Sequence, residues 1–272
     1  MGLTRLGVLG WPVAHSRSPA MFAALGIPYQ RLPVPPELFA ETVRALGPAG
    51  FTGANVTIPH KEAALELADE PSERARAIGA ANTLTFRDDG AIAAENTDAP
   101  GFLAALPESP AGRSALVLGA GGAARAVLYA LREAGANEIR LWNRTPERAR
   151  ALAAQFGVQA VEHVAGAHLL VNCTSVGLGD PSEDALPSFK NGVGLVDNTG
   201  EFASVVDLVY RPDGTELLRS AREQGAIVVD GLEVLVQQGA LSYETWFGHA
   251  PDRDLMREAA YRPHAPSARR NR

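Results

Sequence analysis

The sequence predicts an α/β protein that folds as two domains. Its 272 residues exceed the size at which a single hydrophobic core keeps growing. Apolar strand-like runs alternate with helical patterns along most of the chain, which is the order typical of α/β folds. Residues 107–112, rich in proline and glycine, separate the two halves.

In the first half, short apolar runs predict strands at residues 5–9, 29–34 and 53–58, with helices at 36–46 and 61–68. Residues 83–87 and 91–95 are expected to pair as a hairpin across Asp88-Asp89-Gly90. Thr97 is expected to cap a helix that runs to residue 106. We therefore expect the first domain to occupy residues 1–106.

In the second half, strands are expected at residues 114–118, 138–142, 158–161, 169–173 and 227–230. Either 194–197 or 205–209 is expected to form a further strand. Helical patterns cover 235–247 and 252–261. The expected division is a second domain at 107–236, helices packing back on the first domain at 237–262, and a disordered tail at 263–272.

Composition limits the classes of partner and compartment. A formal net charge of −6 without a basic stripe argues against nucleic acid. Cys173 is the only cysteine, so an intramolecular disulfide is impossible and a reducing compartment fits. No apolar run is long enough to span a bilayer, and the N-terminus lacks a secretion signal. We expect a cytoplasmic monomer or homodimer that acts on a small molecule and has no metal site.

A glycine cluster lies between the strand at 114–118 and the following helix. Its residues are Gly119-Ala120-Gly121-Gly122-Ala123. Glycine is also the default residue of any tight turn, so the cluster alone is weak evidence. Within a strand–helix–strand unit, however, such a turn and the helix N-terminus can hold a pyrophosphate. The context therefore predicts a Rossmann-type dinucleotide-binding domain.

The end of the next strand indicates which dinucleotide is bound. An NAD site usually has Asp or Glu at this point to accept from the ribose 2′-hydroxyl. This chain instead has Asn143, Arg144, Thr145 and, one turn later, Arg148. These arginines could be ordinary solvated surface charges. Their clustering where the ribose must lie favours NADP. The planar guanidinium of Arg144 would bind the 2′-phosphate, and Thr145 and Arg148 lie close enough to contact the same phosphate.

Polar clusters follow the expected strands of the first domain. They are His15-Ser16-Arg17-Ser18, Asn55 and Thr57 with Lys61, Asn82-Thr83, and Asn96-Thr97-Asp98. Each cluster alone has a structural explanation, such as a helix cap or a turn at a strand end. Open α/β sheets bind ligands at their strand ends, however. Together the neutral hydroxyl and amide groups suit a small polyhydroxylated substrate.

Lys61 and Asp98 carry the charges with an obvious chemical use. Reduction of a ketone by a nicotinamide requires a proton for the oxygen, which a lysine can donate while a neighbouring aspartate orients it. In the alternative, Lys61 and Glu62 merely open a helix on the surface. Lysine is a poor choice beside the positive end of a helix, so we predict a catalytic pair.

Nine segments in order make the chain resemble the shikimate dehydrogenase family. They are 10–19, 53–62 (GANVTIPHKE), 78–83 (IGAANT), 95–101 (ENTDAPG), 119–125 (GAGGAAR), 143–148 (NRTPER), 171–177 (VNCTSVG), 207–212 (DLVYRP) and 238–240 (QGA). The family reduces 3-dehydroshikimate to shikimate with NADPH in aromatic amino acid biosynthesis. The resemblance implies two α/β domains with a cleft between them and a C-terminal helix that returns to the first domain.

The resemblance also implies roles for individual residues. Ser16 and Ser18 would bind the substrate carboxylate, and Lys61 with Asp98 would form the catalytic pair. The residues expected to contact the ring hydroxyls or to close over the substrate are Asn55, Thr57, Asn82, Asp98, Tyr210 and Gln238. Gly231 would lie against the nicotinamide, and Thr174 would also contact the cofactor.

Other functions remain open from the sequence. A quinate or aminoshikimate dehydrogenase of the same superfamily is one. Ser18 and Arg144 point away from quinate, because quinate-preferring relatives often carry Thr at the second serine and an acid after the second cofactor strand. A non-catalytic regulatory protein that binds the cofactor is another, and the intact Lys61/Asp98 pair argues against it.

Overall fold

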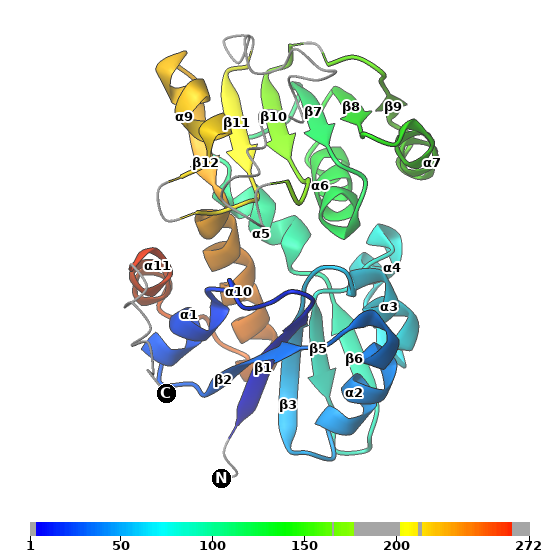
Figure 1. The fold of residues 1–272 in the computed structure, drawn as a ribbon, viewed down its shortest axis with the longest axis vertical. Helices are drawn as coiled ribbons and strands as arrows, with labels where there is room; N and C mark the ends of the chain where they lie inside the picture. The colour runs from blue at the N-terminus through cyan, green and yellow to red at the C-terminus, as the bar shows by residue number, and fades with distance from the viewer. Residues whose placement is uncertain (1–3, 165, 177–201, 212–213, 263–272) are drawn as a thin grey trace, which may run out of the picture.

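The chain forms two α/β lobes with one long helix running between them (Figure 1). The computed structural model describes residues 4–164, 166–176, 202–211 and 214–262. The expected tail at 263–272 and the candidate strand at 194–197 lie outside these residues. Helix α10 (Gly231–Phe247) starts at the second sheet and runs down to the first lobe.

The N-terminal lobe contains a six-stranded mixed sheet of order β2-β1-β3-β5-β6-β4. Its strands are β1 (Arg5–Gly10), β2 (Tyr29–Pro33), β3 (Phe51–Val56), β4 (Glu70–Pro71), β5 (Thr83–Phe86) and β6 (Ile92–Glu95). β1 pairs in parallel with β2 and β3, whereas β5 runs antiparallel to β3 and β6. The predicted hairpin is therefore confirmed.

Short helices surround this sheet. They are α1 (Ser18–Ala24), the 3₁₀ turn η1 (Pro36–Leu38), α2 (Phe39–Leu46), α3 (Lys61–Leu67), α4 (Glu73–Ile78) and α5 (Asp98–Ala105). Sequence reasoning missed β4 and α4. The signal for α4 was present, because Ser72 accepts from the Ala75 amide at 3.0 Å and Gly79 ends the helix in the left-handed region.

The prediction that the Thr97 side chain caps this helix is wrong. Thr97 precedes α5 but its side chain makes no capping bond. Instead, Asn96 Oδ1 accepts from the amides of Asp98 and Ala99, at 3.1 and 3.3 Å. The Thr97 hydroxyl is 3.0 Å from Asn82 Nδ2, so a buried polar contact replaces the cap.

The C-terminal lobe contains six parallel strands in the order β12-β11-β10-β7-β8-β9. They are β7 (Ser114–Leu118), β8 (Glu138–Trp142), β9 (Gln159–Ala160), β10 (Leu169–Asn172), β11 (Ser204–Asp207) and β12 (Ile227–Asp230). Helices α6 (Gly122–Glu133), α7 (Pro146–Phe156) and α9 (Glu216–Glu223) cover the sheet. β11 corresponds to the later of the two candidate segments.

Helix α10 begins four residues earlier than the sequence pattern predicted. Asp230 ends β12 and accepts from the Glu233 amide at 3.0 Å, so the helix starts directly at Gly231. The expected boundary after residue 236 falls inside it. α10 packs closely on α5, where a Cβ on Gly101 would lie 2.7 Å from the Gln238 backbone.

Helix α11 (Arg253–Tyr261) returns to the N-terminal lobe as expected. Arg17, a buried arginine just before α1, donates to the carbonyls of Ala260 and Ala259 at 2.9 and 3.3 Å. These carbonyls lie at the end of α11, where a cation is favourable. The contact ties the C-terminal helix to the loop that carries Ser16 and Ser18.

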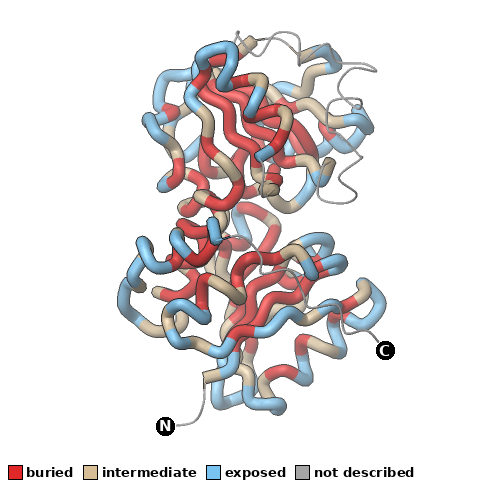
Figure 2. Tube along the Cα trace, turned by 60° about the vertical axis from the view of Figure 1, so that its left-hand side comes forward, coloured by how far each residue is buried: buried red, intermediate tan, exposed pale blue. Residues whose placement is uncertain are grey.

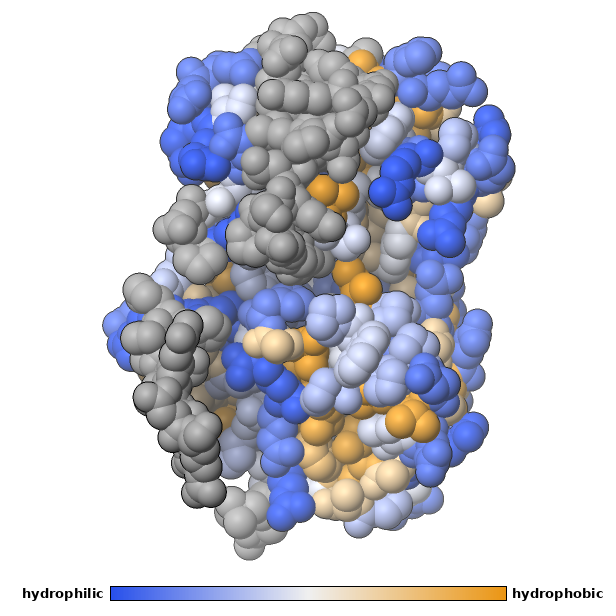
Figure 3. Space-filling model, in the orientation of Figure 1, coloured by the Kyte–Doolittle hydropathy of each residue, from blue (hydrophilic) through white to orange (hydrophobic). Residues whose placement is uncertain are grey.

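Buried residues follow both sheets and the helices that join the lobes (Figure 2). On the face shown in Figure 3, apolar residues gather over β3 of the lower lobe and polar residues surround them. Within the described residues, no helix is long and apolar enough to cross a membrane.

Candidate functional site

A cleft of about 1070 Å³ lies between the two lobes. Lys61 and Glu62 line it from the N-terminal lobe. From the C-terminal lobe, nearly all the predicted cofactor-binding residues line it: Gly119, Ala120, Gly121, Gly122, Ala123, Asn143, Arg144, Thr145, Arg148 and Thr174. Gly231 does not line this cleft. A Cβ at Gly231 would lie 2.4 Å from the Leu208 carbonyl oxygen, so Gly231 packs against the backbone of Asp207 and Leu208.

The glycine turn forms the middle of the cleft. Gly119 has φ +99°, a left-handed value that favours glycine, and a Cβ there would lie 3.0 Å from the Cys173 backbone. Gly121 precedes α6 without any side-chain cap, which leaves the first amides of the helix open. A Cβ on Gly122 would lie 3.1 Å from Lys61 Cβ, so the start of α6 meets the lysine stem. This turn can hold a pyrophosphate next to Lys61.

The turn after β8 carries exposed positive charge. Asn143 Nδ2 donates to the Thr145 carbonyl at 3.0 Å and holds the turn. Among the described residues, neither Arg144 nor Arg148 forms an ion pair, whereas nearby Arg150 pairs with Glu147 at 2.9 Å. Within the part of the chain that the structure describes, the two guanidinium groups therefore have no carboxylate partner and can meet an anion at the rim of the cleft.

Lys61 and Asp98 form an ion pair of 2.7 Å between Nζ and Oδ2. Each is the first residue of its helix, α3 for Lys61 and α5 for Asp98. Their side chains are 13% and 19% exposed, so they are partly desolvated but still accessible. The fold thus brings together two residues 37 positions apart that the sequence predicts to act as a pair.

A buried polar network lies beside this pair. Asn82 Nδ2 donates to the Thr97 hydroxyl at 3.0 Å and to Gln238 Oε1 at 3.2 Å, which connects the first lobe to α10. Asn55 Oδ1 accepts from the Tyr29 hydroxyl at 2.7 Å. The predicted residues Asn55, Asn82 and Gln238 therefore share one cluster, and Thr57 is half-buried directly after β3.

The network includes two hydroxyls to which sequence reasoning assigned no role of their own, although Thr83 belongs to one of the predicted polar clusters. Asn55 Nδ2 donates to Thr83 at 3.1 Å and to Ser242 at 2.8 Å. Thr83 and Ser242 are themselves 2.9 Å apart. Ser242 stands one helical turn after Gln238 on the same face of α10, and this spacing was the available signal.

Ser16 and Ser18 are buried on the loop before and at the start of α1. Arg31 Nε and Nη2 donate to the Ser16 carbonyl at 3.1 and 2.7 Å and fix this loop. Burial, and then the Arg31 charge, lower the pKa of His15. The His15 ring lies 6.4 Å from the ring of Tyr210, which comes from the other lobe. Burial also raises the pKa of the Tyr210 phenol, so it remains protonated.

Cys173 also lines the cleft, between Asn172 and Thr174. Burial, followed by the charge of Asp207, raises the pKa of its thiol. A protonated thiol is a poor nucleophile, so the chemistry of the cleft does not rest on this cysteine.

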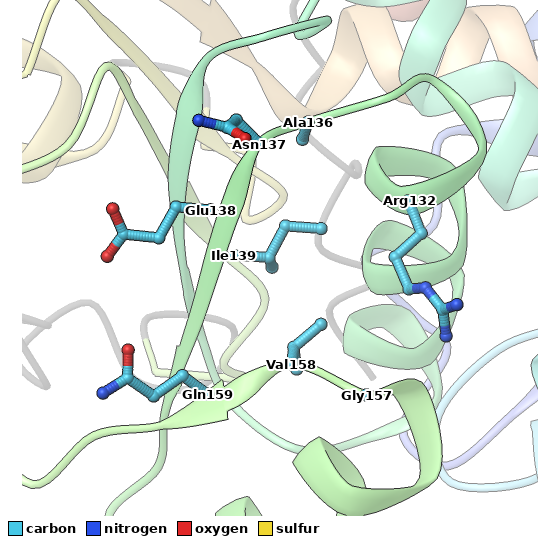
Figure 4. A pocket seen from close by; sticks show the side chains of 8 residues that line it. All are labelled: Arg132, Ala136, Asn137, Glu138, Ile139, Gly157, Val158 and Gln159. Atoms are coloured by element: carbon cyan, nitrogen blue, oxygen red, sulfur yellow. The ribbon is translucent and has the colours of Figure 1, made fainter.

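A second hollow, of about 620 Å³, lies at the amino ends of β8 and β9 in the C-terminal sheet (Figure 4). Its side chains do not converge on a common point. Ile139 and Val158 point toward α6, whereas Glu138 and Gln159 point to the other side of the sheet. Ligand sites need polar groups that converge, so this hollow is not the functional site.

Comparison with known proteins identifies the family. Residues 8–84 match the shikimate dehydrogenase substrate binding domain, 105–174 match shikimate / quinate 5-dehydrogenase, and 231–261 match the shikimate 5′-dehydrogenase C-terminal domain. A shikimate dehydrogenase (NADP(+)) of Thermus thermophilus is 48% identical over 270 residues, covering 96% of this chain and 98% of the relative. The chain belongs to the shikimate dehydrogenase family.

Solved structures agree with this membership. A shikimate 5-dehydrogenase of Thermus thermophilus, in complex with NADP(H) and shikimate, has a TM-score of 0.81 and 47% identity, covering 94% of this chain and 98% of that one. A ligand-free 5-ketofructose reductase of a Gluconobacter species has a TM-score of 0.80 and 32% identity, covering 96% and 98%. The shikimate dehydrogenase fold therefore also carries a reductase of another polyhydroxylated ketone, so substrate choice depends on site residues.

Asp207 gives this member of the shikimate dehydrogenase family a pH-dependent stability. Burial raises the pKa of Asp207 from 3.8 to about 6 in the folded chain. Folding therefore favours the protonated acid, and this stabilisation, present below about pH 4, is lost as the pH rises through about 6. We expect the free energy of unfolding of the wild type to fall by about 3 kcal/mol relative to Asp207→Asn between about pH 4 and 7. Urea denaturation at each pH measures this difference, and parallel curves for the two proteins would contradict it.

Proposed function

We propose that this protein is an NADP-dependent shikimate dehydrogenase, an oxidoreductase that reversibly reduces 3-dehydroshikimate to shikimate with NADPH. The observation that carries the proposal is the Lys61–Asp98 ion pair of 2.7 Å at the edge of the glycine-lined cleft. Membership of the family places this reaction in the shikimate pathway of aromatic amino acid biosynthesis.

In this mechanism Lys61 donates a proton to the ketone oxygen and polarises the carbonyl beforehand. When bound, NADPH supplies the hydride to the carbonyl carbon. Asp98 orients the ammonium group through the 2.7 Å contact and provides a nearby acceptor for its protons. In the direction of shikimate oxidation, the same pair removes the proton from the hydroxyl.

We propose that the substrate lies between this pair and the buried polar network. Ser16 and Ser18 bind the carboxylate, next to Arg31, whose Nη2 donates to the Ser16 carbonyl at 2.7 Å. The ring hydroxyls meet the groups that the structure gathers nearby, Asn55, Thr57, Asn82, Asp98 and Gln238. Tyr210 closes the site from the C-terminal lobe, where its ring lies 6.4 Å from that of His15.

For the cofactor, we propose that the turn Gly119–Ala123 and the open amides of α6 hold the pyrophosphate. Arg144 binds the 2′-phosphate, supported by Arg148, the Thr145 hydroxyl and Asn143. Thr174 and Gly231 lie toward the nicotinamide end. The absence of ion pairs at Arg144 and Arg148 within the described residues supports this assignment.

Three further features belong to the proposal. The substrate domain is residues 1–106, the cofactor domain is 107–236 and includes the first turns of α10, and the rest of α10 with α11, up to residue 262, completes the first domain. The location is cytoplasmic, in keeping with a single, buried cysteine. The protein works as a monomer or homodimer, without nucleic acid as a partner.

We expect NADP-dependent oxidation of shikimate with kcat/KM at least roughly tenfold above that for quinate. Quinate carries an additional hydroxyl and a saturated carbon next to the carboxylate, which a site fitted to the flatter shikimate ring must accommodate. Initial rates with the two alcohols test the expectation. Equal kcat/KM values would favour a quinate-type enzyme, and no turnover of either would favour a non-catalytic protein.

A further inference from the structure

A buried chain of hydrogen bonds joins the carboxyl ends of β10 and β11. Asn172, which is fully buried, donates from Nδ2 to Asp207 Oδ1 at 2.8 Å. Asn172 Oδ1 accepts from the Thr174 amide at 3.1 Å and from the Thr174 hydroxyl at 2.8 Å. Asp207 is thereby connected, through one amide side chain, to a residue that lines the cleft.

The carboxylate of Asp207 fixes the direction of each hydrogen bond in this series. Asp207 also receives the Val209 amide at 3.1 Å and the Thr215 hydroxyl at 2.7 Å, so its oxygens are surrounded by donors. A carboxylate only accepts, and the NH₂ group of Asn172 must therefore face it. The amide oxygen of Asn172 then faces Thr174.

This orientation decides what Thr174 can offer to a ligand. Its hydroxyl has one hydrogen, and that hydrogen is committed to Asn172 Oδ1. The Val176 amide lies 3.4 Å from the same hydroxyl oxygen and uses one of its lone pairs. The lone pair that remains can only accept. Thr174 is therefore suited to a donor group and unsuited to a phosphate oxygen.

The sheet order places Thr174 relative to the rest of the cofactor site. β7, which leads to the glycine turn, lies between β8 and β10. Arg144 follows β8 and Thr174 follows β10, so the two residues flank the turn. With the 2′-phosphate at Arg144 and the pyrophosphate at the turn, the nicotinamide half of the cofactor lies on the side of Thr174.

We propose that Thr174 accepts a hydrogen bond from the nicotinamide half of NADP, and that Asn172 and Asp207 are positioning residues that hold its hydroxyl in the accepting orientation. The donor is a ribose hydroxyl or the carboxamide NH₂ group. The proposal rests on the placement of the cofactor given above. It does not depend on the identity of the substrate.

The test compares two variants that each remove one donor from Asp207. Asn172→Ala removes the 2.8 Å bond and releases Thr174, whereas Thr215→Val removes the 2.7 Å bond and leaves Thr174 in place. Tryptophan fluorescence, to which Trp142 in the cleft contributes, reports binding in the absence of substrate. We expect Asn172→Ala to weaken NADP⁺ about fivefold to tenfold, and Thr215→Val to change it less than about twofold.

Fragments of the cofactor distinguish the two donors. 2′,5′-ADP lacks the nicotinamide half, so both variants should bind it like the wild type. If Asn172→Ala also weakens 2′-phospho-ADP-ribose, which keeps the ribose, the donor is a ribose hydroxyl. If only NADP⁺ is weakened, the donor is the carboxamide. Equal loss for 2′,5′-ADP and NADP⁺ would overturn the proposal.

Equal weakening of NADP⁺ by Asn172→Ala and Thr215→Val would show a purely structural role and would also overturn it. Should Asn172→Ala fail to fold, Thr174→Val removes the accepting oxygen at nearly constant shape, and Thr174→Ser restores it. Loss with valine and recovery with serine is the expected result, and equal affinities for the two would contradict it. Failure of the proposed function would appear separately, as wild-type protein that binds NADP⁺ without oxidising shikimate.

Discussion

Lys61→Ala is expected to lower kcat at least about a hundredfold while the KM for shikimate changes little. The reason is that Lys61 Nζ is held 2.7 Å from Asp98 Oδ2 at the cleft, and the proposed mechanism has it donate the proton that moves in the transition state. Asp98→Asn should lower kcat and also raise the KM, because in the proposed mechanism the carboxylate both orients Lys61 and contacts a ring hydroxyl. Steady-state kinetics with NADP⁺ and shikimate measure both effects.

The matched control is Glu62→Ala, the next residue on α3. Glu62 is half-exposed and pairs with Arg125 across the cleft at 3.4 Å, so its loss removes a charge from the same helix turn without touching Asp98. Exposed ion pairs of this kind contribute little free energy to the folded state, so kcat should stay within about threefold of the wild type. If Lys61→Ala raised only KM, the lysine would be a binding group and the acid–base assignment would be wrong.

Arg144→Ala is expected to raise the KM for NADP⁺ roughly tenfold to a hundredfold, because a charge-assisted hydrogen bond to a phosphate contributes about 1.5–3 kcal/mol. NAD⁺ has no phosphate at this position, so its kinetics should hardly change. The KM for shikimate should also stay constant, since its proposed ligands lie mostly in the other lobe. The measurement is the KM for both cofactors in wild type and variant.

Arg150→Ala supplies the control for charge alone, because Arg150 stands on α7, the helix that follows the Arg144 turn, and is already paired with Glu147 and Glu162. Repeating the assays at low and high salt tests the electrostatic origin, since screening should reduce the advantage of the wild type for NADP⁺. Equal losses for NADP⁺ and NAD⁺ in Arg144→Ala would mean that the arginine supports the adenine or the fold.

The cofactor half of the site could be predicted from sequence because its parts are close together in the chain. The strand before Gly119, the turn itself and Arg144 belong to one strand–helix–strand unit, so local pattern fixes their relative positions. The Lys61–Asp98 contact joins two helices of the other lobe. Its prediction needed both the chemistry of ketone reduction and the resemblance of the surrounding motifs to a family.

The contacts that sequence reasoning missed depend on packing between distant segments. Ser242 meets Asn55 across 187 positions because α10 crosses from the second sheet to the first lobe. Asn172 and Asp207 end neighbouring strands, and their pairing follows from the register of β10 against β11. Apolar periodicity carries no information about either contact, because these residues are polar and buried.

The close contact of α5 with α10 limits which residues can replace Gly101. Gly101 stands one turn after Asp98, and a side chain there would meet the backbone of Gln238 at 2.7 Å. Any larger residue must push the two helices apart, which displaces both Asp98 and Gln238 from the positions that the proposed site requires. We therefore expect a substitution at Gly101 to lower activity by displacing these two side chains, although Gly101 itself offers no side chain to a ligand.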